Sequence, residues 1–116
     1  MLVLCYPKCT TCQKALKWLD EKGIAYDVRN IKEENPTAEE LKKWHSLSGL
    51  PLQRFFNTSG MNYRELGLKD KLPKMSEDEM LQLLAADGML VKRPLLVTDA
   101  KTFPGFREAE WEKMIG

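Results

Sequence analysis

The first thirty residues constrain the fold more than any other part of the chain. Residues 1–5 (MLVLC) form a short apolar run that is typical of a buried strand, and Pro7 then opens a loop. The next segment carries its apolar side chains on one helical face and ends at Gly23, a typical helix stop. Residues 24–28 alternate in polarity, which indicates a second strand. The order strand, loop, helix, strand predicts a βαβ unit.

The middle of the chain has a helical pattern and no strand pattern. Thr37 followed by Glu40, and Ser76 followed by Glu79, are two capping boxes, each placed before a helix-periodic apolar stripe. We therefore expect a helical insertion at about residues 31–88.

The last part of the chain returns to sheet. Residues 93–98 predict a strand entered through a proline, residues 102–103 a further short strand, and residues 108–115 a closing helix. The chain has 116 residues, of which 43% are hydrophobic, a size and composition suited to one domain over residues 1–116. The predicted fold class is α/β, in the order βαβ, helical insertion, ββα.

Charge and hydropathy exclude several classes of function. Eighteen basic and 17 acidic side chains leave a net charge of +1, which argues against direct nucleic-acid binding through a broad basic surface. Residues 1–5 lack a basic lead-in and are too short for a signal or membrane segment, so we expect a cytoplasmic protein without membrane contact. The balanced charge and the lack of a heptad pattern predict a monomer.

Two cysteines with the spacing C-x-x-C lie between the first predicted strand and helix. Cys9 would sit at the helix N-terminus, where free backbone N–H groups and the helix dipole favour a thiolate. Lys8 adds a positive charge beside it. Cys12, one turn inside the helix, is the predicted resolving thiol for a redox-active disulfide with Cys9.

Other interpretations of the cysteines remain open at this point. They could be inert packing residues, or the order Cys5, Cys9, Cys12 could match the spacing of radical S-adenosylmethionine iron–sulfur proteins. A zinc site would need a fourth ligand, and His45 is the only histidine, which we expect at the surface. Cys5 is interpreted as a buried strand residue, too far from Cys9 in an extended chain to bridge. We expect no metal and no tightly bound cofactor.

Five motifs in order along the chain resemble the arsenate-reductase-like/Spx family. They are residues 6–15 (YPKCTTCQKA), 35–37 (NPT), 56–60 (FNTSG), 93–97 (RPLLV) and 105–106 (GF). The resemblance implies a thioredoxin-like fold with a mixed sheet and a helical insertion. It also implies a cis peptide bond before Pro94, ahead of the third strand.

The resemblance further implies which side chains surround Cys9. Arg93 would project beside the thiol, where a guanidinium can stabilise a thiolate or hold an oxyanion. The arsenate reductases of the family use three arginines, of which Arg93 matches the second and Arg107 the third. Asn57 stands where the first is expected, although Arg54 lies one turn away. This departure weakens the case for arsenate reduction, because a full oxyanion clamp needs charge from several directions.

The predicted substrate-binding residues, on the same resemblance, are Lys8, Asn57, Pro94 and Arg107, beside the catalytic set Cys9, Cys12 and Arg93. The predicted function is thiol–disulfide oxidoreduction, in which Cys9 attacks and Cys12 resolves, with a glutathione, glutaredoxin or thioredoxin type of reductant. A first alternative is an Spx-like redox-switched regulator that binds the C-terminal domain of the RNA polymerase α-subunit. A second alternative is a true arsenate reductase.

Overall fold

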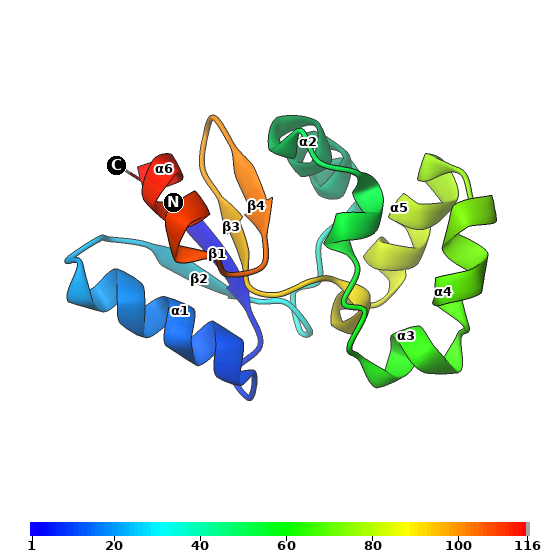
Figure 1. Ribbon diagram of the computed structural model, residues 1–116, viewed down its shortest axis with the longest axis horizontal. Coiled ribbons are helices and arrows are strands. Elements are labelled where there is room, and N and C mark those ends of the chain that lie inside the picture. The colour runs from blue at the N-terminus through cyan, green and yellow to red at the C-terminus, as the bar shows by residue number, and fades with distance from the viewer. Residues whose placement is uncertain (116) are drawn as a thin grey trace.

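A four-stranded mixed sheet forms the centre of the computed structural model, which describes residues 1–115 (Figure 1). The strand order is β2-β1-β3-β4. Strand β1 pairs in parallel with β2 and antiparallel with β3, and β3 pairs antiparallel with β4. The bounds are β1 Leu2–Cys5, β2 Asp27–Asn30, β3 Leu95–Val97 and β4 Thr102–Pro104. The α/β class and the thioredoxin-like arrangement are therefore confirmed.

The two faces of the sheet have different covers, set by the alternation of side chains along β1. Val3 and Cys5 belong to a buried cluster with Leu19 of α1 (Thr10–Glu21) and Trp111 of α6 (Glu108–Ile115). Leu4 points the other way, into a cluster built mainly by the segment between β2 and β3. Figure 1 shows α1 and α6 beside the strands at the left of the view, and the inserted helices α3, α4 and α5 at the right.

The second strand begins later than predicted. Residues 24–28 were expected, but Ile24 N–H closes the helix end by donating to Leu19 O at 3.1 Å, and the strand runs over Asp27–Asn30. Its register is set by pairing with β1, with Asp27 opposite Leu2. Because β2 is an edge strand, Val28 remains 53% exposed despite its apolar side chain.

Seven short helical segments lie between β2 and β3. They are α2 Ala38–Ser48, η1 Leu52–Phe55, α3 Met61–Glu65, α4 Leu68–Lys71, η2 Leu72–Lys74, α5 Glu77–Ala86 and η3 Gly88–Leu90. Both predicted capping boxes are present, Thr37 with Glu40 and Ser76 with Glu79, and each begins the helix that follows it. Within residues 1–115, no helix is long and apolar enough to cross a membrane.

The inserted segment is fastened to the chain that enters β3. An isolated antiparallel bridge joins Phe56 to Val91, although the sequence pattern predicts no extended pairing before residue 88. Lys92 N–H donates to Phe55 O at 2.7 Å, and Asn57 N–H donates to Leu90 O at 2.8 Å. These bonds hold the loop after η1 beside the residues that lead into β3.

Candidate active site at the cysteine loop

The loop that follows β1 turns sharply and places Cys9 at the start of α1. Cys9 N–H donates to Tyr6 O at 2.9 Å, which closes a tight turn, and Gln13 N–H donates to Cys9 O at 3.1 Å in the first helical turn. Cys9 is the N-cap residue of α1. Its half-buried thiol therefore lies where unpaired backbone N–H groups and the helix dipole favour negative charge.

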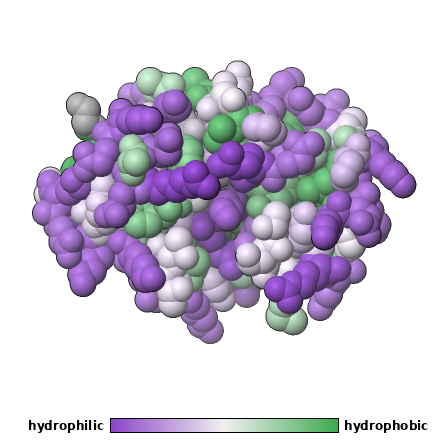
Figure 2. Space-filling model, in the orientation of Figure 1, coloured by the Kyte–Doolittle hydropathy of each residue, from purple (hydrophilic) through white to green (hydrophobic). Residues whose placement is uncertain are grey.

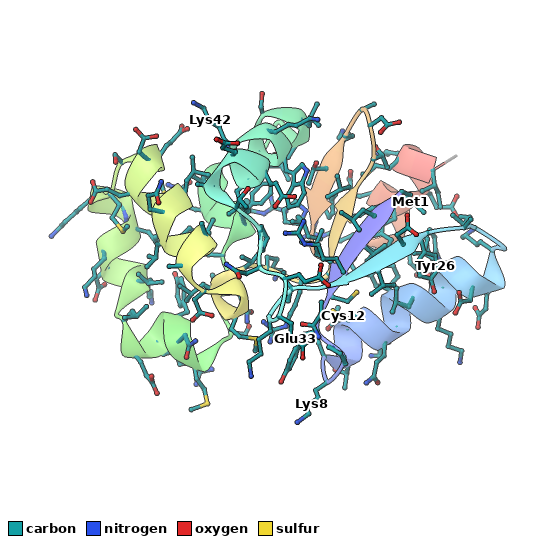
Figure 3. The ribbon with its side chains drawn as sticks, turned by 180° about the vertical axis from the view of Figure 1, so that it is seen from behind. Met1, Lys8, Cys12, Tyr26, Glu33 and Lys42 are labelled. Carbon is teal, nitrogen blue, oxygen red and sulfur yellow. The ribbon has the colours of Figure 1, made fainter. Side chains whose placement is uncertain are left out.

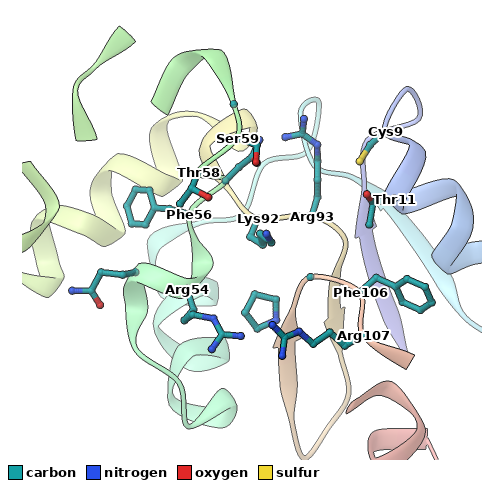
Figure 4. Close-up of a pocket in the computed structure, with 15 residues that line it drawn as sticks. Cys9, Thr11, Arg54, Phe56, Thr58, Ser59, Lys92, Arg93, Phe106 and Arg107 are labelled. Carbon is teal, nitrogen blue, oxygen red and sulfur yellow. The ribbon is translucent and has the colours of Figure 1, made fainter. Parts of the chain in front are cut away.

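The Cys9 thiol opens onto a cleft of about 530 Å³ between the cysteine loop and the inserted segment. Of the predicted site residues, Asn57, Arg93 and Arg107 also line this cleft. In Figure 4 the Cys9 sulfur faces Arg93, and hydrophilic side chains cross the middle of the corresponding face in Figure 2. The tertiary structure thus brings together residues that the sequence places far apart.

Four cationic side chains line the cleft, and among residues 1–115 no acidic side chain does. They are Arg54, Lys92, Arg93 and Arg107. Among residues 1–115, none of the four forms an ion pair. Arg54 and Arg107 point toward each other across the cleft in Figure 4. Unpaired cations around one space create a positive potential that favours an anionic ligand or a thiolate.

Arg93 is held in place while part of its guanidinium remains free. Its Cζ lies 5.4 Å from the centre of the Tyr6 ring, and Nη1 donates to Met89 O at 3.4 Å. Its buried Nε has no hydrogen-bond partner within the described part of the chain. A buried guanidinium N–H without a partner costs free energy, so Arg93 carries an unsatisfied donor beside the cleft.

Behind Cys9, two further thiols lie in contact. Cys5 and Cys12 are 3% and 1% exposed, and all three cysteines are free thiols. A hydrogen bond from the Cys5 thiol lowers the pKa of Cys12, and burial opposes this effect. The Tyr6 N–H, the Cys9 thiol and the charge of Arg93 lower the pKa of Cys12 further. The same hydrogen bond, together with burial, raises the pKa of Cys5.

Cys5 is the buried last residue of β1, as the sequence pattern predicts. Its closeness to Cys12 was not predicted, and it arises because the turn at Tyr6 folds the loop back, so that α1 packs on the end of β1. Cys12 is buried rather than cleft-lining, and it lies between the other two thiols.

Two predicted substrate-binding residues lie outside the cleft. Lys8 is exposed and points away from the molecule in Figure 3, and Pro94 is buried. Neither lines the cleft. The Arg93–Pro94 peptide bond is cis, as the resemblance implies. Lys8 extends into solvent because the tight turn directs its side chain outward.

The sequence pattern assigned no site role to Lys92, and a role to Arg54 only by proximity. The one available signal for Lys92 was its position next to Arg93. His45 is far from the cysteine loop, half-buried with its ring 5.9 Å from the ring of Phe55. Among the described residues, no group of three or more histidine, cysteine or acidic side chains could hold a metal ion.

A cysteine at a helix N-cap, on a thioredoxin-like sheet and facing a basic cleft, is typical of the class of proteins that act through a reactive thiol. More specifically, the chain belongs to the ArsC family, whose sequence model matches residues 4–114. The uncharacterized protein YusI of Bacillus subtilis is 56% identical over 108 residues, covering 93% of this chain and 92% of YusI.

Two further relatives extend the comparison. The regulatory protein MgsR of Bacillus subtilis is 33% identical over 94% of this chain and 85% of its own length. The crystal structure of an ArsC family related protein from Bacteroides fragilis superposes with a TM-score of 0.95. It is 57% identical and covers 97% of this chain and 95% of that one. Fold and family are thus established together.

Proposed function

We propose that this chain is a thiol–disulfide redox protein in which Cys9 is the nucleophile and Cys12 the resolving thiol. The observation that carries the proposal is the position of Cys9. Its thiol lies at the N-terminus of α1 and opens onto a cleft with four cations, while Cys12 lies directly behind it. An accessible thiol in an electropositive environment, backed by a second thiol, is typical of disulfide exchange.

The reaction proceeds in two balanced steps. The Cys9 thiolate attacks one sulfur of a disulfide substrate, so that a mixed disulfide forms and the other half of the substrate leaves as a thiolate. Cys12 then attacks the Cys9 sulfur, which releases the second half as a thiolate and forms the Cys9–Cys12 disulfide. The substrate gains two electrons, and the leaving thiolates take up the protons of the two cysteines. A dithiol of the thioredoxin or glutaredoxin type, or glutathione, returns two electrons to the protein.

The surrounding charges support each step. The lowered pKa of Cys12 supplies the thiolate that the resolving step needs. Arg93 and Arg54 favour substrates with negative charge close to the reacting sulfur. We also propose that the protein is a cytoplasmic, single-domain monomer, because clustered cysteines in a reducing compartment are more often catalytic than structural and because the charge is balanced.

The test compares two disulfide reagents of opposite electrostatic character. Wild type and the variants Arg93→Ala and Arg54→Ala react with 5,5′-dithiobis(2-nitrobenzoate), a dianion, and with uncharged 2,2′-dithiodipyridine. We expect each variant to lose about tenfold in rate with the dianion, equivalent to about 1.4 kcal/mol, and little with the neutral reagent. Lys8→Ala is the matched control, because Lys8 is a nearby cation outside the cleft.

Two results would contradict the proposal. One is a Cys9→Ser variant that reacts with either reagent as fast as wild type. The other is an equal loss with both reagents, which would show that the arginines act on Cys9 or on the fold rather than on the charge of the substrate.

Arsenate reduction is a second candidate, favoured by the position of Arg54. Although Asn57 occupies the place of the first expected arginine, Arg54 lines the same cleft as Arg93 and Arg107. We expect weak or absent arsenate turnover with glutathione and glutaredoxin supplied, since one of the three arginines that would hold the oxyanion is replaced by Asn57. Robust turnover that is lost in Cys9→Ser and unchanged in Cys12→Ser would replace the main proposal with this one.

A regulatory role is a third candidate, favoured by the similarity to MgsR. In this case the Cys9–Cys12 disulfide would switch binding to the C-terminal domain of the RNA polymerase α-subunit. A pull-down with that domain, in dithiothreitol and after oxidation, tests it. Binding in one redox state only supports the regulator, and no binding in either state removes it.

A further inference from the structure

We propose that Cys5 is a third redox-active thiol of this site, able to take over the disulfide from Cys9 by exchange at Cys12. This inference rests on the proposed function, because it starts from the Cys9–Cys12 disulfide. It assigns a chemical role to a strand residue that a C-x-x-C motif does not include.

The first support is the linear order of the three thiols. Cys5 and Cys12 belong to one buried cluster and line one pocket, whereas Cys9 packs against that cluster and lines the cleft on its other side. Cys5 ends β1 and Cys12 lies in the first turn of α1, so the packing of the helix on the strand end brings the two sulfurs together. The middle sulfur can therefore be attacked from either side.

The second support is the difference in environment along this line of thiols. Cys9 lines the charged cleft, and Cys5 and Cys12 line a separate, mainly apolar pocket of about 170 Å³ together with Tyr6 and Leu16. A disulfide is uncharged and apolar, so the inner pair suits that surrounding better than a thiol and a thiolate do. Cys9, in contrast, is half-buried at the N-cap of α1 and faces the cations of the cleft.

The exchange step conserves atoms and electrons. The Cys5 sulfur attacks the Cys12 sulfur of the Cys9–Cys12 disulfide, a Cys5–Cys12 bond forms, and the Cys9–Cys12 bond breaks. Cys9 leaves as a thiolate, and the proton of Cys5 passes to solvent or to Cys9. No oxidant is needed, because one disulfide replaces another.

Oxidation itself removes the main obstacle to this attack. In the reduced protein, the hydrogen bond to Cys12 keeps the proton on Cys5 and is the largest cause of its raised pKa. Once Cys12 is part of a disulfide, it carries no negative charge and that cause is gone. Burial still slows the reaction, so we expect the transfer to follow the formation of the Cys9–Cys12 disulfide rather than to precede it.

The sequence offers a direct test by peptide mapping. Trypsin cleaves after Lys8 and Lys14, which separates Cys5, in residues 1–8, from Cys9 and Cys12, in residues 9–14. Full-length protein is oxidised with one equivalent of diamide, quenched with acid at increasing times, blocked with N-ethylmaleimide and digested. A Cys9–Cys12 disulfide stays within peptide 9–14, whereas a Cys5–Cys12 disulfide links the two peptides.

We expect the internal disulfide in wild type first and the linked peptides later. Cys9→Ser should give the linked peptides directly, and Cys12→Ser should give none. Cys5→Ala should lose the linked product and keep the internal disulfide. Because Cys9 is only half-buried, Cys9→Ser reports on the Cys5–Cys12 pair even where the Cys5 variant folds poorly.

The outcomes that overturn the inference differ from those that overturn the proposed function. An internal disulfide in wild type at all times, with no linked peptides in Cys9→Ser, refutes the role of Cys5 and leaves the proposed function intact. Linked peptides in Cys12→Ser would show that Cys12 is not the central thiol. Lack of any disulfide within peptide 9–14, in wild type and in Cys5→Ala, refutes the proposed function.

Discussion

Replacing Glu40 by glutamine should lower the stability of the fold in a pH-dependent way. Glu40 accepts two hydrogen bonds from the guanidinium of Arg29, at 2.7 and 2.9 Å, and this pair joins β2 to α2. The bonds from Arg29 are the largest cause that lowers the pKa of Glu40, from its ordinary 4.5 to about 2. Glutamine keeps the capping box with Thr37 through its amide oxygen, but it loses the charge and one of the two hydrogen bonds from Arg29, because its amide nitrogen donates and does not accept.

The magnitude follows from the shift in pKa. A difference of this size corresponds to about 3 kcal/mol for a fully buried group, since each pKa unit is about 1.4 kcal/mol. The Glu40 side chain is 35% exposed, so screening by solvent reduces the contribution to about 1.5 kcal/mol. Because the pKa is lower in the folded state, this stabilisation is present above about pH 4.5 and disappears as the pH falls toward about 2.

Urea denaturation of wild type and Glu40→Gln at a series of pH values measures this effect. We expect the variant to be about 1.5 kcal/mol less stable near neutral pH, with the difference shrinking to nearly zero at about pH 2. Glu39→Gln is the matched control, because Glu39 is an exposed acid in the same first turn of α2 without an ion pair in the described part of the chain. Equal losses in both variants, or a loss that does not depend on pH, would refute the reasoning.

Three further substitutions test the packing and the chemistry. Gly88→Ala should lower the free energy of unfolding, measured by urea denaturation, by about 3 kcal/mol, because the new Cβ would lie 1.8 Å from the backbone oxygen of Ile31. A loss of stability below about 1 kcal/mol would contradict this contact. Thr102→Val should raise the free energy of unfolding by about 1 kcal/mol, because the buried Thr102 hydroxyl lacks a hydrogen-bond partner within residues 1–115; a marked loss would reveal an unrecognised partner. Cys12→Ser should retain the mixed disulfide on Cys9 after reaction with 5,5′-dithiobis(2-nitrobenzoate), seen by intact mass, whereas wild type should release the second thiol; equal release would exclude Cys12 as the resolving thiol.

Much of the fold was predictable because its signals are local. The two capping boxes, at Thr37 and Ser76, each predicted the start of a helix, since the bonds that form them lie within one helical turn. The order of strands and helices followed from apolar periodicity. The start of β2 was wrong by three residues, because Asp27 begins the strand through its pairing with β1, which no local pattern reveals.

The candidate site likewise combines features that the local sequence encodes with contacts that only tertiary packing creates. The position of Cys9 at a strand-to-helix junction, with Cys12 one turn further on, is encoded locally, because strand, turn and helix are neighbours in the chain. Which distant side chains meet there depends instead on tertiary packing. The bridge between Phe56 and Val91 brings Arg54 to the same cleft as Arg93, and the packing of α1 on β1 brings Cys5 to Cys12. Such contacts depend on how elements pack and not on spacing along the chain, so their chemistry emerges only when the chain is folded.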